Sequence, residues 1–525
     1  MREEILDFVR ERGILLEKEV FDLIYGLNDS KAAKDLIKAL EESSGQKIIS
    51  RAILNKNFEF VKNIARDFPG EQKIYLESVF VKLGLSLEIK KESEVFNERK
   101  EFGQTEKAER NPDYKVHYAE TKPEKKLEVR DFVSNFRARY QSMQRILMGR
   151  AELTNLTSIN KISSERKSVS IIGIVSEKRI TKNKNMIIKL EDLTGEISVL
   201  VKADNRELFL AAEELLLDDV VGVRASGNKD LLFAHGVYYP DTFNAYKTKF
   251  EEDINIVFLS DVHCGSKAHL EKSFSHFLEW INSDDEDAKK KKYIFFTGDN
   301  VDGVGIFPGQ EKFLLLKSMK EQYEMLYSYI NQIPKRITMF MCPGQHDASR
   351  VAEPQPIISR KYAPNLYGIE NLILVTSPAM VRLIEKEKEF KVLMYHGASL
   401  NHIISEIKEL RMMKAHRCPA AAVKHLLKRR HLAPTHSSVV YIPNADKDPL
   451  VIDEVPDIIC TGDLHRSDIE NYNGVLIIAG SCWQAQTDFM EKVGAVPDPG
   501  KAILFNLKNR EIKIYNFLDD EEKTV

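Results

Sequence analysis

The sequence INIVFLSDVH, residues 254–263, is a short apolar run that ends in Asp261-Val262-His263. Four more apolar runs in the second half of the chain also end in a polar motif. These motifs are Gly298-Asp299-Asn300-Val301-Asp302, Pro343-Gly344-Gln345-His346-Asp347, His396-Gly397 and Gly462-Asp463-Leu464-His465. Short apolar runs that end in Gly, Asp or His are typical of buried strands of an α/β sheet. Because such sheets bind ligands at the carboxyl ends of their strands, we expect the five motifs to converge on one rim.

The residue types in these motifs suit a site with two metal ions. Hydrolysis of a phosphodiester needs a nucleophile at neutral pH and compensation of charge on two oxygens, and two ions about 3.5 to 4 Å apart supply both. Carboxylates, imidazoles and a side-chain amide suit Mn, Fe or Zn. Asp261 and His263 lie two residues apart on an extended segment, so they point to the same side and can share one ion. Asp299 follows a strand and is our choice for a bridging ligand.

Each motif alone has a plainer interpretation. A single Asp-x-His or Gly-Asp is more often a loop turn than a ligand pair. The order of the motifs and their shared strand-then-loop context favour a site. The histidines agree with this, since only His117 and His235 of the 13 precede residue 260. We expect the histidines outside the motifs to be surface or core residues.

Taken together, the five motifs resemble the calcineurin-like metallophosphoesterase superfamily. A β-rich segment before them, and the stretch from Gly480 to Thr487 that runs on to Pro497-Asp498-Pro499, resemble the small subunits of archaeal family-D replicative DNA polymerases. The resemblance covers residues 165–517. It implies a 3′ to 5′ DNA exonuclease that proofreads single-stranded or mismatched primer ends with two divalent ions, Mn first and Mg, Fe or Zn as alternatives. It also implies a large partner subunit that carries the polymerase site.

The resemblance assigns a role to each motif residue. The first ion would be held by Asp261, His263 and His465, and Asp299 would bridge both ions. The second ion would be held by Gln345, His396 and Asp463. His346 would stabilise the transition state or protonate the leaving oxygen, with Asp347 beside it as an orienting group. The superfamily has Asn in place of Gln345 and His in place of Asp463, so the identity and affinity of the second ion stay open.

Composition limits the class of protein. A net charge of -3 over 525 residues excludes a generally basic coat for nucleic acid, so any DNA binding would use local patches. The first residues are charged where a signal peptide would be apolar, and no run approaches about 18 apolar residues. We therefore expect a cytoplasmic protein with no membrane association. The five cysteines include no Cys-x-x-Cys pair, so neither disulfides nor a thiolate zinc site is expected.

We expect a multidomain α+β chain. Residues 1–88 predict a small helical domain, and the charged residues 89–126 predict a flexible linker. Residues 127–164 predict an amphipathic helix and a connector. Residues 165–245 predict five strands with a helix between the third and fourth, which is the plan of an OB-fold barrel. Residues 250–525 predict an α/β metallophosphoesterase domain built as a β-sandwich.

Some interpretations have competitors. The predicted barrel is poor in aromatic residues, so we favour a protein-docking role for it over direct DNA binding. A basic helical stretch could follow a DNA backbone or be a solvated helix face: Lys424, Lys428, Arg429 and Arg430. Two other functions compete with the exonuclease: a catalytically weak scaffold subunit and a phosphatase of another substrate class. The intact motifs argue against the first, and the added domains argue against the second.

Overall fold

The computed structural model describes residues 2–25, 30–44, 47–49, 113–121, 126–165, 167–493 and 495–522. The chain divides into two compact units, Met1–Glu109 and Arg110–Val525. Residues 51–112, which hold the rest of the expected helical domain and most of the expected linker, lie outside the described residues. In the part of the chain that the structure describes, no helix combines the length and the apolar character needed to cross a membrane.

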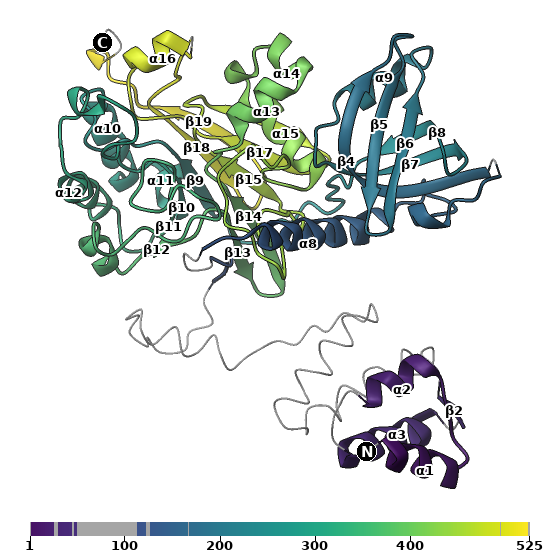
Figure 1. Ribbon diagram of the computed structural model, residues 1–525. Helices are drawn as coiled ribbons and strands as arrows, with labels where there is room; N and C mark the ends of the chain where they lie inside the picture. Colours follow the sequence, from purple (N-terminus) through teal and green to yellow (C-terminus); the bar gives the residue numbers. More distant parts are fainter. Residues whose placement is uncertain are drawn as a thin grey trace. The chain divides into compact units, whose positions relative to one another are not determined.

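The first unit contains helices and one short strand pair (Figure 1). Its helices are α1 (Arg2–Glu11), α2 (Lys18–Tyr25) and α3 (Ser30–Ser44). The strands β1 (Leu15–Leu16) and β2 (Ile48–Ile49) pair in parallel and were not expected from the sequence. Buried Ile5, Ile24 and Ile37 supply apolar contacts within this unit.

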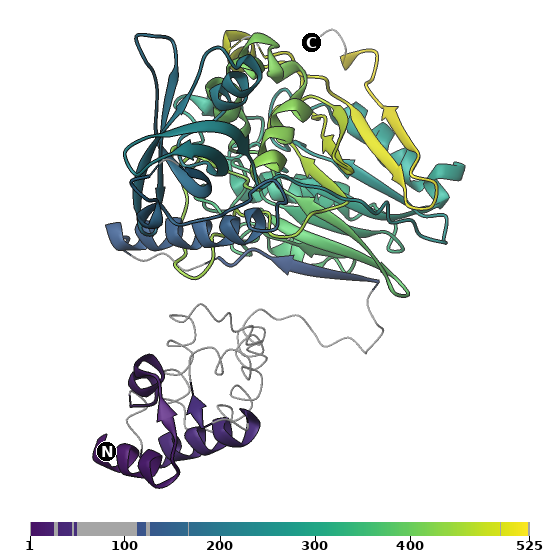
Figure 2. The same ribbon diagram turned by 90° about the vertical axis from the view of Figure 1, so that its right-hand side faces the viewer.

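The second unit is built on two six-stranded sheets (Figures 1 and 2). The first sheet has the order β12-β11-β10-β9-β18-β19. Its strands are β9 (Asn255–Leu259), β10 (Lys291–Thr297), β11 (Thr338–Cys342), β12 (Leu372–Leu374), β18 (Lys501–Asn506) and β19 (Ile512–Asn516). Strands β9 to β12 run parallel, and β18 and β19 are antiparallel to their neighbours.

The second sheet has the order β16-β17-β15-β14-β13-β3. Its strands are β3 (Tyr114–Tyr118), β13 (Ala379–Glu385), β14 (Lys388–Met394), β15 (Ile458–Thr461), β16 (Asp468–Tyr472) and β17 (Val475–Ala479). The first three motifs therefore follow strands of one sheet, and the last two follow strands of the other. The expected linker also needs correction, because Tyr114–Tyr118 pairs with β13 as an edge strand.

The two sheets and their helices pack through three apolar layers, one between the sheets and one on the outer face of each sheet. Alternate residues of both sheets, such as Phe258, Phe295 and Val392, pack against one another between them. Helices α10 (Glu271–Asn282) and α12 (Met319–Ile330) cover the outer face of the first sheet. Helices α13 (Leu400–Glu406), α14 (Lys408–Met412) and α15 (Pro419–Arg429) cover the second. Two further short helices are α11 (Glu286–Lys289) and α16 (Asp488–Val493). The result is a β-sandwich between helical layers.

Residues 167–238 form a closed five-stranded barrel with the order β4-β5-β6-β8-β7. Its strands are β4 (Lys167–Ile180), β5 (Met186–Asp192), β6 (Gly195–Val201), β7 (Val220–Gly227) and β8 (Leu232–Tyr238). Helix α9 (Arg206–Glu213) lies between the third and fourth strands in sequence. The amphipathic helix α8 (Val129–Leu147) runs alongside the barrel in both views and buries Tyr140, Met143 and Leu147 against it (Figures 1 and 2).

Two residues of the basic stretch, Lys428 and Arg429 on α15, face the barrel. Arg429 is 3% exposed, and its Nε lies 3.0 Å from Asp219 Oδ1 of the barrel. Lys428 Nζ pairs with Glu214 at 2.6 Å. Arg430 is also buried and donates to the carbonyl oxygen of Ile452. The sequence left DNA contact and a solvated helix face open for this stretch, and neither describes these two arginines, because both guanidinium groups are used inside the protein. Lys424 stays partly exposed beside Glu470.

Candidate metal centre

The five motifs meet where strands β9, β10, β11, β14 and β15 end. Backbone hydrogen bonds tie the first motif to the second, since Asp261 N donates to Gly298 O and His263 N donates to Asp299 O. Several motif residues adopt the left-handed backbone conformation, which L residues rarely use: Asp261, His263, Asp299, Asp463 and His465. Such strain persists where the surroundings hold it and is concentrated at functional sites. It turns the side chains of these residues toward one another.

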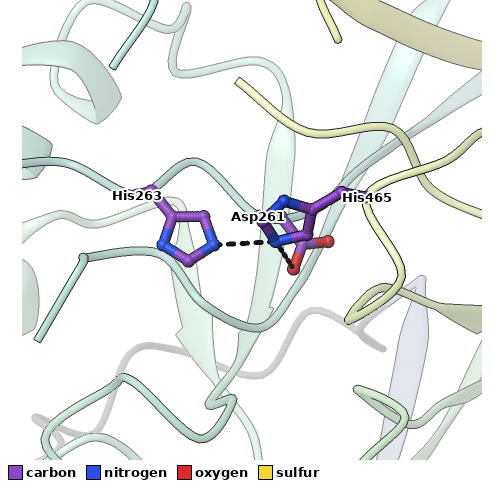
Figure 3. Close-up of side chains that lie close together, drawn as sticks. All are labelled: Asp261, His263 and His465. Carbon is purple, nitrogen blue, oxygen red and sulfur yellow. Dashed lines mark hydrogen bonds and ion pairs between the residues drawn. The ribbon is translucent and has the colours of Figure 1, made fainter. Parts of the chain in front are cut away.

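The first cluster is formed by Asp261, His263 and His465 (Figure 3). Nε2 of His263 lies 3.0 Å from Nε2 of His465, and Nε2 of His465 lies 3.4 Å from Oδ1 of Asp261. Nδ1 of His263 contacts the carboxylate of Asp302 at 3.0 Å, so it carries the proton and leaves Nε2 as an acceptor. Three electron-pair donors therefore surround one point, which is the arrangement that holds a metal ion.

The second cluster contains Asp261, Asp299 and His396, all buried. Nδ1 of His396 donates to the carbonyl oxygen of Thr297, which leaves Nε2 turned toward Asp299 Oδ2 at 3.2 Å. Burial lowers the pKa of His396, but the surrounding carboxylates, Asp299 first, raise this pKa well above its ordinary value. Gly344 permits this close packing, because a Cβ there would lie 2.2 Å from Asp299 Oδ1.

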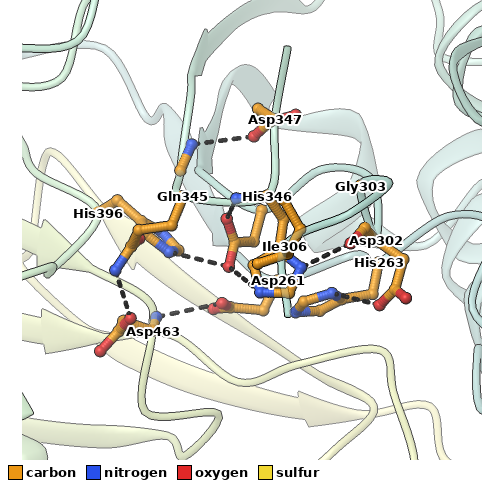
Figure 4. Close-up of polar contacts among 12 residues, drawn as sticks. Asp261, His263, Asp302, Gly303, Ile306, Gln345, His346, Asp347, His396 and Asp463 are labelled. Atoms are coloured by element: carbon orange, nitrogen blue, oxygen red, sulfur yellow. Dashed lines mark hydrogen bonds and ion pairs between the residues drawn. The ribbon is translucent and has the colours of Figure 1, made fainter. Parts of the chain in front are cut away.

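Gln345 and Asp463 complete the rim of the second cluster (Figure 4). Nε2 of Gln345 donates to Asp463 Oδ1 at 2.9 Å, and Nδ2 of Asn401 donates to the other oxygen at 3.0 Å. The backbone N–H of Asp463 donates to Asp261 Oδ1 at 3.1 Å. Burial raises the pKa of Asp463 to about 6. Both departures from the superfamily pattern thus contact each other directly.

His346 lies beside both clusters, with its Nε2 3.9 Å from Asp299 Oδ2. Its backbone N–H donates to Asp299 Oδ1 at 2.8 Å, and its Nδ1 donates to the carbonyl oxygen of Asp302 at 2.6 Å. The ring is therefore oriented by Asp302. Asp347 was expected to orient it, and this expectation is wrong.

Asp347 instead braces the surrounding loops. Its carboxylate accepts hydrogen bonds from the backbone N–H groups of Asn300 and Gly344 and from the Tyr323 hydroxyl. Burial, with a contribution from Asp299, raises the pKa of Asp347 to about 6. These hydrogen bonds fix the positions of two motifs relative to each other, and none of them goes to the His346 ring.

Sequence reasoning missed Asp302 and Gln484. Asp302 contacts His263 through its carboxylate and His346 through its carbonyl group. Gln484 Nε2 donates to Asp302 Oδ1 at 3.0 Å and to Ser266 Oγ at 2.8 Å. Asp302 stood in the second motif, three residues after Asp299, and that spacing was the available signal. For Gln484 the sequence offered no signal beyond its place in the stretch from Gly480 to Thr487.

The donor set fits divalent cations. Among the described residues, Asp261 Oδ2 and Gln345 Oε1 have no hydrogen-bond partner, although both atoms are buried. Unpaired buried acceptors are costly and rare in folded proteins, and a cation would satisfy them. Carboxylates, neutral imidazoles and an amide oxygen are ligands that Mn, Fe and Zn accept. The residues predicted as metal ligands from the sequence are therefore brought together in one place.

Comparisons with known proteins give consistent matches. The family model for the B subunits of DNA polymerases alpha and epsilon matches residues 256–470. A DNA polymerase II small subunit from Methanothermobacter thermautotrophicus is 37% identical over 72% of this chain and 78% of its own length. Its counterpart from Archaeoglobus fulgidus is 36% identical over 74% and 77%, respectively. The one from Pyrococcus furiosus is 35% identical over 74% of this chain, but the match spans only 64% of that longer protein.

Proposed function

The chain belongs to the family of DNA polymerase II small subunits, and from this premise we propose that it is a metal-dependent 3′ to 5′ exonuclease acting on primer ends. As a small subunit it works with a large subunit in a two-subunit DNA polymerase. The observation that carries the proposal is the packing of three carboxylates and three imidazoles, contributed by strand ends of two sheets, around two adjacent points: Asp261, Asp299, Asp463, His263, His396 and His465.

Two ions fit this donor set. Asp261, His263 and His465 would hold the first, and His396, Gln345 and Asp463 the second, with Asp299 between them. When bound, two such ions make water a nucleophile at neutral pH and offset charge on the oxygens of the scissile phosphate. The carboxylate at Asp463 adds a hard oxygen donor where the superfamily has imidazole, so Mn is our first choice.

His346 has the role of the general acid in this proposal. Because its Nδ1 proton is held by the Asp302 carbonyl, its Nε2 faces the clusters. The ring acts as an acid in its doubly protonated form, which carries a second proton on Nε2 and gives that proton to the leaving oxygen. Nε2 is 3.9 Å from Asp299 Oδ2 and the His346 side chain is 22% exposed, so the ring can reach a departing oxygen. A positioned imidazole of this kind contributes about 10²- to 10⁴-fold to rate.

The remaining domains fit a subunit better than a freestanding phosphatase. We assign the closed barrel, with its helix between the third and fourth strands, to the OB-fold class. Its exposed strands carry few aromatic residues, which favours protein docking over single-strand binding. We also assign the β-sandwich to the calcineurin-like metallophosphoesterases. A freestanding phosphatase would leave such a docking domain without a partner.

A scaffold without strong catalysis is the second candidate. It is favoured by the hydrogen bond from Gln345 to Asp463, because this bond occupies Oδ1 of Asp463, an oxygen that the second ion would otherwise use. The same bond also pre-positions both groups at one side of the second cluster. The two candidates therefore make different predictions about activity with added metal.

A nuclease assay distinguishes them. The complex with its large subunit is incubated with single-stranded, mismatched and paired primers in Mn, and again with a chelator. The exonuclease proposal expects shortening of the single-stranded and mismatched 3′ ends in Mn and none with chelator. Intact primers under every condition, from a complex that still extends primers, would support the scaffold instead.

A further inference from the structure

The loop of residues 303–317, here called the rim loop, exposes apolar side chains next to the candidate metal centre. It connects the second motif to α12. Its exposed large side chains are Val304, Ile306, Phe313 and Leu315, which is 60% exposed. Clustered exposed apolar groups on a soluble protein mark a binding surface more often than scattered ones do.

The rim loop is held in place by two buried glutamines, so its exposed groups are not the result of a loose segment. Gln322 accepts from Gly303 N at 2.8 Å and donates to Leu316 O at 2.8 Å. Gln310 accepts from Ile306 N at 2.9 Å and donates to Asp302 O at 2.9 Å. Both ends of the loop are thereby fixed, and Leu314 is buried while its neighbours Phe313 and Leu315 stay exposed.

The rim loop adjoins the proposed general acid directly. A Cβ on Gly303 would lie 2.6 Å from the carbonyl oxygen of His346 and 2.8 Å from Cδ1 of Ile306. Ile306 and His346 therefore pack against the same Cα, and Figure 4 shows them side by side. A strand whose last phosphodiester reaches His346 therefore lies next to this loop.

The charge around the rim loop suits a polyanion. Lys312 and Lys317 are exposed, and Lys267 approaches the loop by donating to Lys312 O at 2.7 Å. Glu311 is the single acidic residue in the sequence of the loop. Phe313 lies 6.3 Å from Phe307, centroid to centroid, so two aromatic rings lie at one place. Aromatic rings next to lysines are a common arrangement in sites that bind single-stranded DNA.

We propose that the rim loop binds the unpaired terminal bases of a DNA 3′ end by stacking on Phe313 and packing on Ile306 and Leu315. This inference rests on the proposed function, because it assigns the loop to the same substrate. It predicts a preference for frayed or mismatched ends, because a paired terminal base cannot leave its partner to stack on the loop without the cost of unpairing.

The test measures binding without hydrolysis. The full chain, in chelator, is titrated into single-stranded oligonucleotides that carry 2-aminopurine at the 3′ or the 5′ terminus. We expect a fluorescence change at the 3′ terminus and a weaker one at the 5′ terminus. The variant Phe313→Ala with Leu315→Ala should weaken binding of the 3′ end roughly tenfold, from loss of stacking. The matched control is Phe243→Ala, which removes an exposed aromatic side chain outside the loop.

The outcomes separate this inference from the proposed function. Equal signals at both termini, or unchanged affinity in the loop variant, would overturn the role of the loop, even if the wild-type complex degrades primers in Mn. Loss of co-purification with the large subunit at unchanged oligonucleotide affinity would also overturn it, since the loop would then bind protein. A 3′ signal that the loop variant loses, in a chain that hydrolyses nothing in Mn, would support the loop and contradict the exonuclease.

Discussion

Gln345 Nε2 donates a 2.9 Å hydrogen bond to Asp463 Oδ1, so the two residues that depart from the superfamily pattern contact each other at the second cluster. Gln345 is longer than the Asn of the superfamily, and Asp463 is shorter than the His. The longer amide therefore reaches the shorter carboxylate. A change at one position is thus matched by the change at the other. Asp463 is therefore the most informative residue to substitute in a test of whether a second ion is bound.

We predict that Asp463→Ala weakens the second ion. The Mn concentration for half-maximal activity should rise by about tenfold or more, since loss of a residue that merely orients a ligand already costs that much affinity. Asp463→His should shift metal preference away from Mn. The control is Asp463→Asn, which keeps a side chain suited to the left-handed turn at this position. Wild-type metal dependence in both the Ala and Asn variants would make Asp463 a turn residue only.

His346→Ala should lower turnover by about 10²- to 10⁴-fold, because the leaving oxygen loses its proton donor. Bound metal should stay near the wild-type amount, since the ring is oriented by Asp302 and lies 3.9 Å from Asp299. Metal content of the purified variant is measured by mass spectrometry beside the kinetics. A lost ion in this variant would reassign His346 as a ligand.

The sequence predicted those parts of the molecule whose signals are local. Each strand that carries a motif shows its apolar run, and each barrel strand shows its own pattern. The role of Asp347 was misjudged because neighbours in sequence need not face the same way, and the turn sends its side chain toward Asn300 and Gly344. Arg429 was misjudged because its partner, Asp219, is 210 residues away in sequence.

Strand β3 shows the same limit. Tyr114–Tyr118 lies in a charged region that predicts a linker, and only its pairing with β13 makes it a strand. Local composition cannot reveal a partner that lies so far along the chain. Pairing with a distant strand, and not the local sequence, therefore determines the structure of β3.

Asp448 is predicted to stabilise the fold at neutral pH. Its Oδ2 accepts from Arg139 Nε at 2.7 Å and contacts His431 Nε2 at 3.0 Å, and all three side chains are buried. Burial raises the pKa of Asp448, but Arg139 and His431 together hold this pKa well below its ordinary value. The folded protein therefore binds fewer protons here than the unfolded chain. The stabilisation is present above pH of about 4 and is lost as pH falls toward the folded pKa.

Asp448→Asn should accordingly lower the free energy of unfolding by roughly 3 to 5 kcal/mol at pH 7, because it leaves Arg139 buried without a counter-charge. The deficit should shrink as the pH is lowered below about 4. Denaturant unfolding at several pH values measures it. Asp284→Asn, at an exposed carboxylate, is the control. A deficit that stays constant across this pH range would exclude the ionised carboxylate as its source.

Two truncations test the boundary between the units. Removal of residues 1–109 should leave a folded fragment that still binds the large subunit, because the second unit begins at Arg110. Removal of residues 1–125 should lower the melting temperature, since it strips β3 from β13 and removes the packing of Tyr114 and Val116. Co-purification and thermal melting measure the two effects. Loss of binding with the shorter deletion would place the contact with the large subunit in the first 109 residues.

The most direct measurement is degradation of a mismatched primer by the assembled polymerase carrying Asp299→Ala, with Asp284→Ala as the matched control at an exposed carboxylate. Asp299 lies in the second cluster, contacts His396 and accepts from the backbone of His346, so its loss should remove 3′ shortening in Mn while primer extension by the large subunit continues. Undiminished shortening by the Asp299→Ala complex, at the rate of the control, would place the nuclease outside this site and contradict the proposed function.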